Sequence, residues 1–181
     1  MQYIFGAIYM MNSNIIIRQA QSKDIESIAM IKVEGWKNAY KGLIDDEYLS
    51  SMSVNEQIKV INNYSLDTIF VAENGDEILG FCRFYDYDKP VYEDEEIDCE
   101  IREIYVKPDM KRMGIGSNLF AYTMDYFQKK DKKKLYLGCF KDNHTARKFY
   151  EKMGGIPQAG KDLEIGEKHY PTVSYIYDLS K

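Results

Sequence analysis

The sequence predicts one α/β layer sandwich, an α+β arrangement in which helices flank a central, mixed and mostly antiparallel sheet. An Asn74-Gly75 turn separates two β-rich runs, which indicates an antiparallel meander. A strand ending at Val106, a helix beginning at Gly114 and a strand beginning at Leu135 indicate a β-α-β crossover. The chain has 181 residues, 45% hydrophobic and 29% charged, which suits a single soluble domain. This order of elements is not that of a doubly wound dinucleotide fold.

The first half of the chain predicts a strand, two helical segments and a hairpin. The first helix has an apolar face at helical spacing, formed by Ile25, Ile28, Ala29, Trp36 and the stem of Lys32. Gly42 ends this pattern, and a second helical segment over about 45–64 is expected to break near 50–53. Strands are expected over 15–18, 68–72 and 78–85.

The second half predicts alternating strands and helices and then a closing hairpin. Pro108 ends a strand, and Gly154-Gly155 ends the last helix. Strands are expected over 101–106 and 135–140, helices over 114–130 and 145–153, and the closing hairpin over 163–165 and 170–179.

Charge argues against a nucleic-acid partner, because the net charge is −5 and the basic residues are mostly dispersed. The run Lys129–Lys134 is interpreted as a solvated helix end, where cations complement the helix dipole. An acidic stretch over 86–100 could form a negative rim that attracts a cationic amine, or simply a solvated loop. Its acids are Asp86, Asp88, Glu93, Asp94, Glu95, Glu96, Asp98 and Glu100.

The three cysteines, an odd number without C-x-x-C spacing, indicate a reducing compartment, and we expect a cytoplasmic protein. Two histidines, His144 and His169, with no cluster of ligands predict no catalytic metal. Cys139 lies in a strand expected to be buried, which disfavours covalent catalysis.

Residues 1–14 are too short to span a bilayer and are expected to be a leader or an extra strand before one domain over 15–181. No membrane partner is expected.

The segment from Ile104 to Ser117 carries the strongest chemical signal. A strand ends, a loop with Gly114 and Gly116 follows, and a helix begins. Glycines let the backbone approach a ligand, and a helix N-terminus offers unpaired N–H groups, so the segment suits a pyrophosphate. The P-loop pattern fails because Gly-Lys-Ser/Thr is absent, and the dinucleotide fingerprint fails because Leu119 replaces its third glycine.

Two motifs resemble the GNAT superfamily of N-acetyltransferases. Lys111 to Gly116 is similar to that family's acetyl-CoA motif, [Q/R]-x-x-G-x-[G/A], and 135–154 looks like its next strand, Asn-x-x-Ala-x-x-Phe-Tyr helix and glycine end. The likeness covers about 15–179 and is sharp over 100–155. It implies a GNAT-type fold with about seven strands, acetyl-CoA as acyl donor, and transfer of acetyl to an amine by direct attack in a ternary complex.

The resemblance also implies a cofactor site. Backbone groups along 104–106 would pair with the acetyl-pantetheine arm, amides from the loop would hold the pyrophosphate, and Asn143 would bind the arm. Lys111 departs from the usual Gln or Arg, which keeps a cation without a forked donor. The implied cofactor residues are Ile104, Tyr105, Val106, Lys111, Arg112, Met113, Gly114, Ile115, Gly116, Ser117, Asn143 and Tyr150.

The reaction needs a base, because an ammonium must lose a proton before it attacks. Glu100 and Glu103 are the candidates, and residues three apart in a strand face opposite ways unless a bulge intervenes. The resemblance favours Glu100; alternatively both are solvent-facing acids. Some relatives carry Glu at the slot of Gly138, an arrangement excluded here. An N–H near Val106 could hold the carbonyl oxygen.

Tyr150 would donate a proton to the leaving thiolate, although helical periodicity also suits a core position.

Trp36 and Tyr40 lie in a region that overhangs the acceptor site in GNAT folds, so they could bind substrate or simply pack. The acceptor would be a small-molecule or peptide amine. Residues 36–49 weakly resemble polyamine-type enzymes. Family members are often dimers, so a homodimer is compatible. The alternative function is a non-catalytic acyl-CoA-binding sensor.

Overall fold

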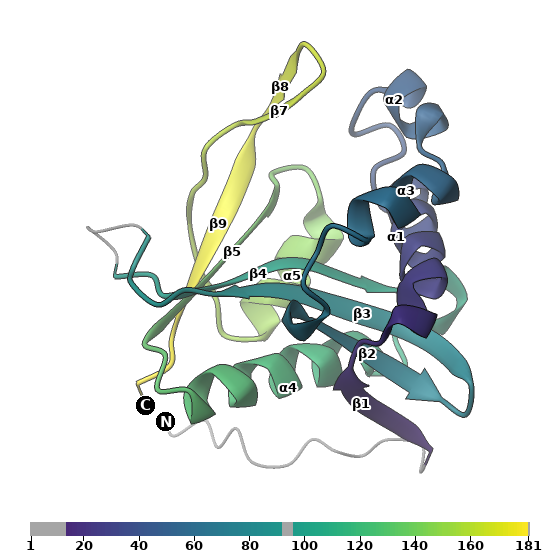
Figure 1. The fold of residues 1–181 in the computed structure, drawn as a ribbon. Helices are drawn as coiled ribbons and strands as arrows, with labels where there is room; N and C mark the ends of the chain where they lie inside the picture. Colours follow the sequence, from purple (N-terminus) through teal and green to yellow (C-terminus); the bar gives the residue numbers. More distant parts are fainter. Residues whose placement is uncertain (1–13, 92–95, 181) are drawn as a thin grey trace.

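The computed structural model describes residues 14–91 and 96–180, which form a seven-stranded sheet with helices on both faces (Figure 1). The strand order is β1-β2-β3-β4-β5-β9-β6. Within this sheet, β4 pairs with β5 in parallel, and the other neighbouring strands of the described chain pair antiparallel. The predicted mixed, mostly antiparallel sheet is therefore confirmed. The strands are β1 Ile15–Gln19, β2 Ile69–Asn74, β3 Glu77–Asp86, β4 Cys99–Val106, β5 Lys134–Phe140, β6 Ile156–Ala159 and β9 Thr172–Asp178.

Helices α1 and α3 cover one face of the sheet, and α4 and α5 cover the other. Each face has its own buried cluster, so strand β3 is buried on both sides. The break expected near 50–53 is present because Met52 is extended and the Ser53 hydroxyl accepts a hydrogen bond from the Glu56 amide, which begins α3. The helices are α1 Ile25–Ala39, α2 Asp46–Ser51, α3 Val54–Ile61, α4 Ile115–Lys129 and α5 His144–Lys152.

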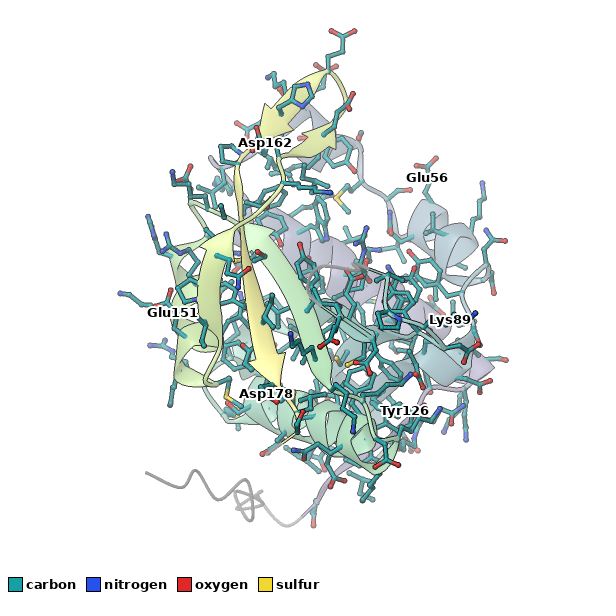
Figure 2. All side chains as sticks on the ribbon, turned by 90° about the vertical axis from the view of Figure 1, so that its left-hand side faces the viewer. Glu56, Lys89, Tyr126, Glu151, Asp162 and Asp178 are labelled. Carbon is teal, nitrogen blue, oxygen red and sulfur yellow. The ribbon has the colours of Figure 1, made fainter. Side chains whose placement is uncertain are left out.

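The end of the chain differs from the predicted closing hairpin. β7, Leu163–Ile165, pairs with β8, Lys168–Tyr170, whereas β9 returns to the main sheet between β5 and β6. Strand β6 was not predicted, because its four residues are all exposed and include Pro157, so no apolar alternation marks it. Figure 2 shows the β7–β8 hairpin, near Asp162, projecting from the end of the sheet opposite to α4, marked by Tyr126.

The acidic stretch and the lysine run bind each other. Asp86 accepts a hydrogen bond from Lys130 at 2.7 Å and lies 2.5 Å from Lys132. Asp98 accepts from the backbone amides of Lys133 and Lys134, where β5 begins. Part of the proposed negative rim is thus neutralised within the fold. Glu93, Asp94 and Glu95 lie outside the described residues, as does the predicted leader up to residue 13. No described helix is long and apolar enough to cross a membrane.

Helix α1 is fixed to β4 by close packing at Gly35. A Cβ atom there would lie 2.6 Å from the ring of Tyr105, far closer than side chains approach. Glycine is therefore required in the middle of this helix, against its low helix propensity.

A buried ion cluster holds the same two elements together. The Lys32 ammonium lies 2.8 Å from Glu103, and the Arg83 guanidinium lies 3.4 Å from its other oxygen. Lys32 and Arg83 are buried, and Arg83 stacks 4.2 Å above the ring of Tyr64. Two cations thus face one carboxylate between α1 and the sheet.

Gly35→Ala should destabilise the protein by about 1 kcal/mol. The helix gains about 1 kcal/mol from alanine, but overpacking against Tyr105 costs more. Urea denaturation measures the difference. In a Tyr105→Leu background the same change should stabilise the protein, and a loss of stability in both backgrounds would contradict the packing argument.

Glu103→Gln should lower the unfolding free energy by about 3 kcal/mol, because Lys32 and Arg83 would remain buried without a counter-charge. The matched control is Glu77→Gln. It removes the charge of an exposed carboxylate that pairs with Lys107, and it should lower the unfolding free energy by less than about 1 kcal/mol. Equal effects of the two changes in chemical denaturation would show that the cluster does not hold α1.

Candidate active site

β4 and β5 part soon after they meet. They pair at Cys99 with Leu135 and at Glu100 with Tyr136, and no further pairs join them in the described chain. Beyond this point β5 continues beside β9 and β4 continues beside β3, so the two ribbons diverge (Figure 1). We call the region between 101–106 and 137–140 the fork. Its β4 edge has no strand neighbour among the described residues and can receive an extended ligand.

The loop predicted to bind pyrophosphate lies at the open end of the fork. Gly114 has φ of 83° and occupies the N-cap of α4, so the left-handed conformation explains this glycine. Arg112 is also left-handed, with φ of 66°. Residues 111–114 are exposed, and the first-turn amides of α4 point out of the helix without helical partners. The geometry is that of an anion site.

No contact within the protein requires a glycine at position 116. A Cβ atom there would lie 3.6 Å from Val106 and 4.0 Å from Phe149, which are ordinary contacts. The glycine instead leaves the backbone open between α4 and β4, where a ligand running from the loop into the fork would pass. The Lys111 ammonium donates to the Asn38 side chain on α1 at 2.8 Å.

Three tyrosine side chains come together beside the fork. The hydroxyls of Tyr40 and Tyr105 are 3.2 Å apart, and both tyrosines interact electrostatically with Tyr150. Burial raises the pKa of Tyr40 and holds those of Tyr105 and Tyr150 well above the ordinary value. All three are therefore protonated donors near neutral pH.

Asn143 joins this group from the turn after β5. Its side-chain oxygen accepts from the Ala146 amide and caps α5. Hydrogen bonding to Asn143 partly opposes the burial that raises the pKa of Tyr40. Side chains from the end of α1, from β4 and from the start of α5 thus lie near one another, while the ring of Tyr150 also packs in the core against Tyr175.

A bulge places both candidate bases on one face of the sheet. Arg83 pairs with Glu103, but the next β3 residue, Phe84, pairs with Ile101, so Arg102 is an extra residue in β4. Tyr85 then pairs with Glu100. Glu100 and Glu103 would face opposite ways in a regular strand, but the bulge between them puts both on one face.

The two carboxylates have different partners. Glu100 is buried, accepts from the Tyr87 hydroxyl at 2.8 Å and pairs with Arg102 at 2.9 Å. Neither glutamate is the solvent-facing strand acid of the alternative interpretation. Glu103 faces the buried ammonium and guanidinium described above.

Trp36 and Tyr40 lie in an aromatic cluster at the end of α1. Their rings meet edge to face at 4.9 Å, and Tyr40 meets Phe140 at the end of β5 in the same way. Tyr170 of the β7–β8 hairpin packs on Phe140 at 5.9 Å, and its hydroxyl accepts from the Asp45 amide. Phe140 and Tyr170 were missed because no local pattern joins a strand end to a distant hairpin. The buried indole N–H of Trp36 has no hydrogen-bond partner among the described residues.

Cys139 does not suit a nucleophile. Burial raises the pKa of its thiol to about 11, so the thiolate is scarce near neutral pH. In the described ranges, no three His, Cys, Asp or Glu side chains gather in a way that could hold a metal.

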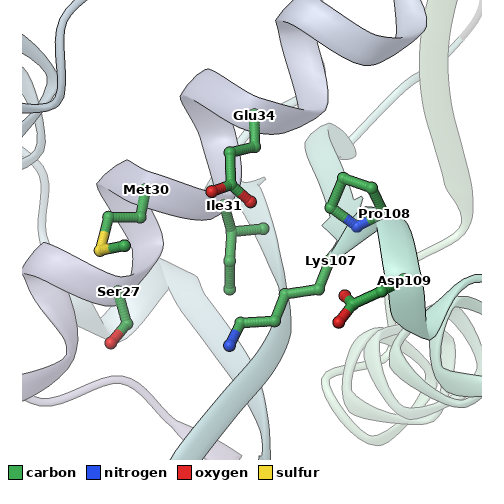
Figure 3. A pocket seen from close by; sticks show the side chains of 7 residues that line it. All are labelled: Ser27, Met30, Ile31, Glu34, Lys107, Pro108 and Asp109. Atoms are coloured by element: carbon green, nitrogen blue, oxygen red, sulfur yellow. The ribbon is translucent and has the colours of Figure 1, made fainter.

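Two surface cavities are lined by residues other than the predicted site residues. One of about 350 Å³ lies between α1 and the residues after β4, and its lining includes the acids Glu34 and Asp109 as well as Lys107 (Figure 3). Lys107 is already paired with Glu77, so the lining does not suit an anion. The other, about 370 Å³, lies on α5 beside Arg147 and Lys148. The fork and its loop therefore remain the candidate site.

Comparison with known proteins agrees with this geometry. A model of the Acetyltransferase (GNAT) family matches residues 28–155. An N-acetyltransferase of Archaeoglobus fulgidus, described as uncharacterized, is 28% identical over 134 residues, covering 74% of this chain and 88% of that protein. Spermidine N(1)-acetyltransferase of Thermoplasma acidophilum is 25% identical over 151 residues, covering 78% of this chain and 88% of that protein.

Among solved structures, the fold resembles the PaiA N-acetyltransferase of Thermoplasma acidophilum in complex with coenzyme A. The TM-score is 0.64 at 22% identity, covering 90% of this chain and 99% of the other. The family match contains the fork, the loop before α4 and all of α5. The chain belongs to the GNAT family and is an N-acetyltransferase.

Proposed function

We propose that the protein transfers the acetyl group of acetyl-CoA to a primary amine by direct attack within a ternary complex. The observation that carries the proposal is the fork, because its unpaired β4 edge leads from the exposed amides of α4 to the buried Glu100. An extended arm can pair with such an edge while its phosphates meet the helix N-terminus.

The residues present fit this ligand. Backbone groups of Ile104, Tyr105 and Val106 would pair with the arm, Asn143 would bind it from the other side of the fork, and Tyr150 would lie near its sulfur. When bound, acetyl-CoA supplies an activated thioester. The loop residues that would hold its pyrophosphate are Lys111, Arg112, Met113, Gly114, Ile115, Gly116 and Ser117.

Glu100 is the better candidate for the base. Its ion-pair partner Arg102 has a side chain 53% exposed and can move away, whereas the partners of Glu103 are buried. Glu100 would accept the proton from the acceptor amine. A backbone N–H near Val106 would donate to the carbonyl oxygen as it gains charge.

Tyr150 would donate a hydrogen bond to the departing sulfur. Its raised pKa keeps the hydroxyl protonated through the neutral range, so the donor is present whenever the thiolate leaves. Trp36 and Tyr40 would form part of the acceptor side.

The acceptor we propose to test first is a polyamine. The similarity to a spermidine acetyltransferase supports this choice, as does the need of Glu100 for a cationic partner. The alternative of an acyl-CoA-binding sensor is compatible with the contacts of Glu100. A carboxylate that stays engaged by Tyr87 and Arg102 would not accept a proton from an amine.

Acetyl-CoA at 100 times its Kd should stabilise the protein by about 2.7 kcal/mol, which raises Tm by roughly 5–11 °C. Gly114→Ala and Gly116→Ala should abolish the rise, measured by thermal unfolding. Gly75→Ala is the matched control, because its φ of 62° carries the same strain in a turn away from the fork. An unchanged Tm at millimolar acetyl-CoA would refute the cofactor site.

Glu100→Gln should lower kcat/KM by about 10²- to 10⁴-fold and Tyr150→Phe by about 10²-fold, while both keep the Tm rise with acetyl-CoA. Release of free thiol during acetylation of spermidine and other amines measures the rates, with Glu77→Gln as a control carboxylate. A wild-type protein that binds acetyl-CoA but acetylates none of the amines would favour the sensor.

A further inference from the structure

We propose that the Arg102 guanidinium occupies, in the acceptor-free protein, the subsite that the acceptor's ammonium takes over before reaction. The inference rests on the proposed function and names a specificity-determining residue that the family motifs do not include. In the acceptor-free protein, Arg102 would pair with Glu100 in place of the substrate's ammonium group.

Arg102 lies two residues after Glu100 in β4 and is the extra residue of the bulge. The β3–β4 register shifts between Glu103 and Ile101, so Arg102 has no partner on β3. The guanidinium bends back to Oε1 of Glu100 at 2.9 Å. A residue with no partner on β3 thereby covers the buried carboxylate.

The exposure of the two partners shows which one can move. The Glu100 side chain is 6% exposed, whereas that of Arg102 is 53% exposed. A carboxylate buried to this extent needs a cation, and a long, half-exposed side chain is the part that can leave. At Glu103, by contrast, both cationic side chains are less than a tenth exposed, so an incoming cation has nothing to displace there.

The surroundings of the guanidinium suit cations in general. Tyr87 donates its hydroxyl to the second oxygen of Glu100 at 2.8 Å, which leaves Oε1 for a cation. The rings of Tyr85 and Tyr87 stack at 5.9 Å. Hydrogen bonding to Glu100 raises the pKa of Arg102, with smaller contributions from the two tyrosines. Aromatic faces beside a carboxylate bind alkylammonium ions as well as guanidinium.

The position of this subsite matches the reaction. Glu100 pairs with Tyr136 at the last rung before the fork opens. An arm extending along β4 from the α4 loop would end near this rung. An ammonium replacing Arg102 would therefore meet the base beside the closed end of the fork, and Glu100 would keep one cation as its partner throughout the exchange.

The test measures amine binding without turnover. Spermidine, n-butylamine and 6-aminohexanoate are titrated calorimetrically into the coenzyme A-saturated wild type, Arg102→Gln and Arg102→Lys, with Lys129→Gln as a control for the loss of one positive charge at a distant surface pair. We expect Arg102→Gln to bind spermidine and n-butylamine about five-fold more tightly, since the competing ion pair is gone. Arg102→Lys and Lys129→Gln should bind like the wild type.

Unchanged or weaker binding of spermidine and n-butylamine to Arg102→Gln, or no binding of either, would overturn the inference. So would weaker binding of 6-aminohexanoate alone, which would mean that Arg102 recognises a carboxylate on the acceptor. Failure of the proposed function has a different signature: no Tm rise with acetyl-CoA and no thiol release, whatever the amine affinities.

Discussion

The separation of β4 from β5 after two residue pairs is the constraint on which the rest of the structure depends. Each strand keeps its outer neighbour, β3 or β9, so the sheet stays intact while one internal edge of β4 is left open. Backbone donors and acceptors need partners, and an edge inside a fold is normally closed by another strand. Here the opening lies beside a helix N-terminus, and these two features are the basis of the proposed acetyl-CoA site.

The elements around the fork are held by contacts that do not involve a ligand. Gly35 and the Lys32–Glu103–Arg83 cluster fix α1 on β4, and Tyr40 then contacts both Tyr105 and Phe140. Tyr40 therefore contacts both diverging strands on the face of the sheet that α1 covers. On the other face, α5 begins at Asn143 directly after β5, so its position follows from that of the strand. The site is assembled from rigid elements, which suits a reaction that depends on orientation.

Local signals in the sequence predict much of this arrangement. Gly114 before α4, the Asn74-Gly75 turn and the Asn143 helix start each have a short-range physical cause, and each element appears where expected. The bulge at Arg102 has no such signal, because it depends on how β3 and β4 align. The sequence therefore allows Glu100 and Glu103 to share a face without specifying that they do. Strand β6 lacks a pattern of apolar residues, and the contact of Tyr170 with Phe140 joins segments far apart in the chain. Tertiary pairing decides these features.

The bulge in β4 also determines which side chains in the first half of the strand reach each face of the sheet. Beyond the bulge, the loop and α4 anchor the strand, while Cys99 and Ile101 are anchored by the core under α4. Because the bulge absorbs Arg102, deleting this residue would leave the pairing of Ile101 and Glu100 with β3 unchanged and keep both carboxylates on the α1 face. Regular pairing through Arg102 would instead turn Glu100 into the apolar core under α4 and Cys99 out of it. The bulge, rather than a residue at position 102 as such, is therefore the condition for having both carboxylates on one face. One residue can be removed from this strand without exchanging its two faces, whereas straightening the strand with all its residues kept would exchange them.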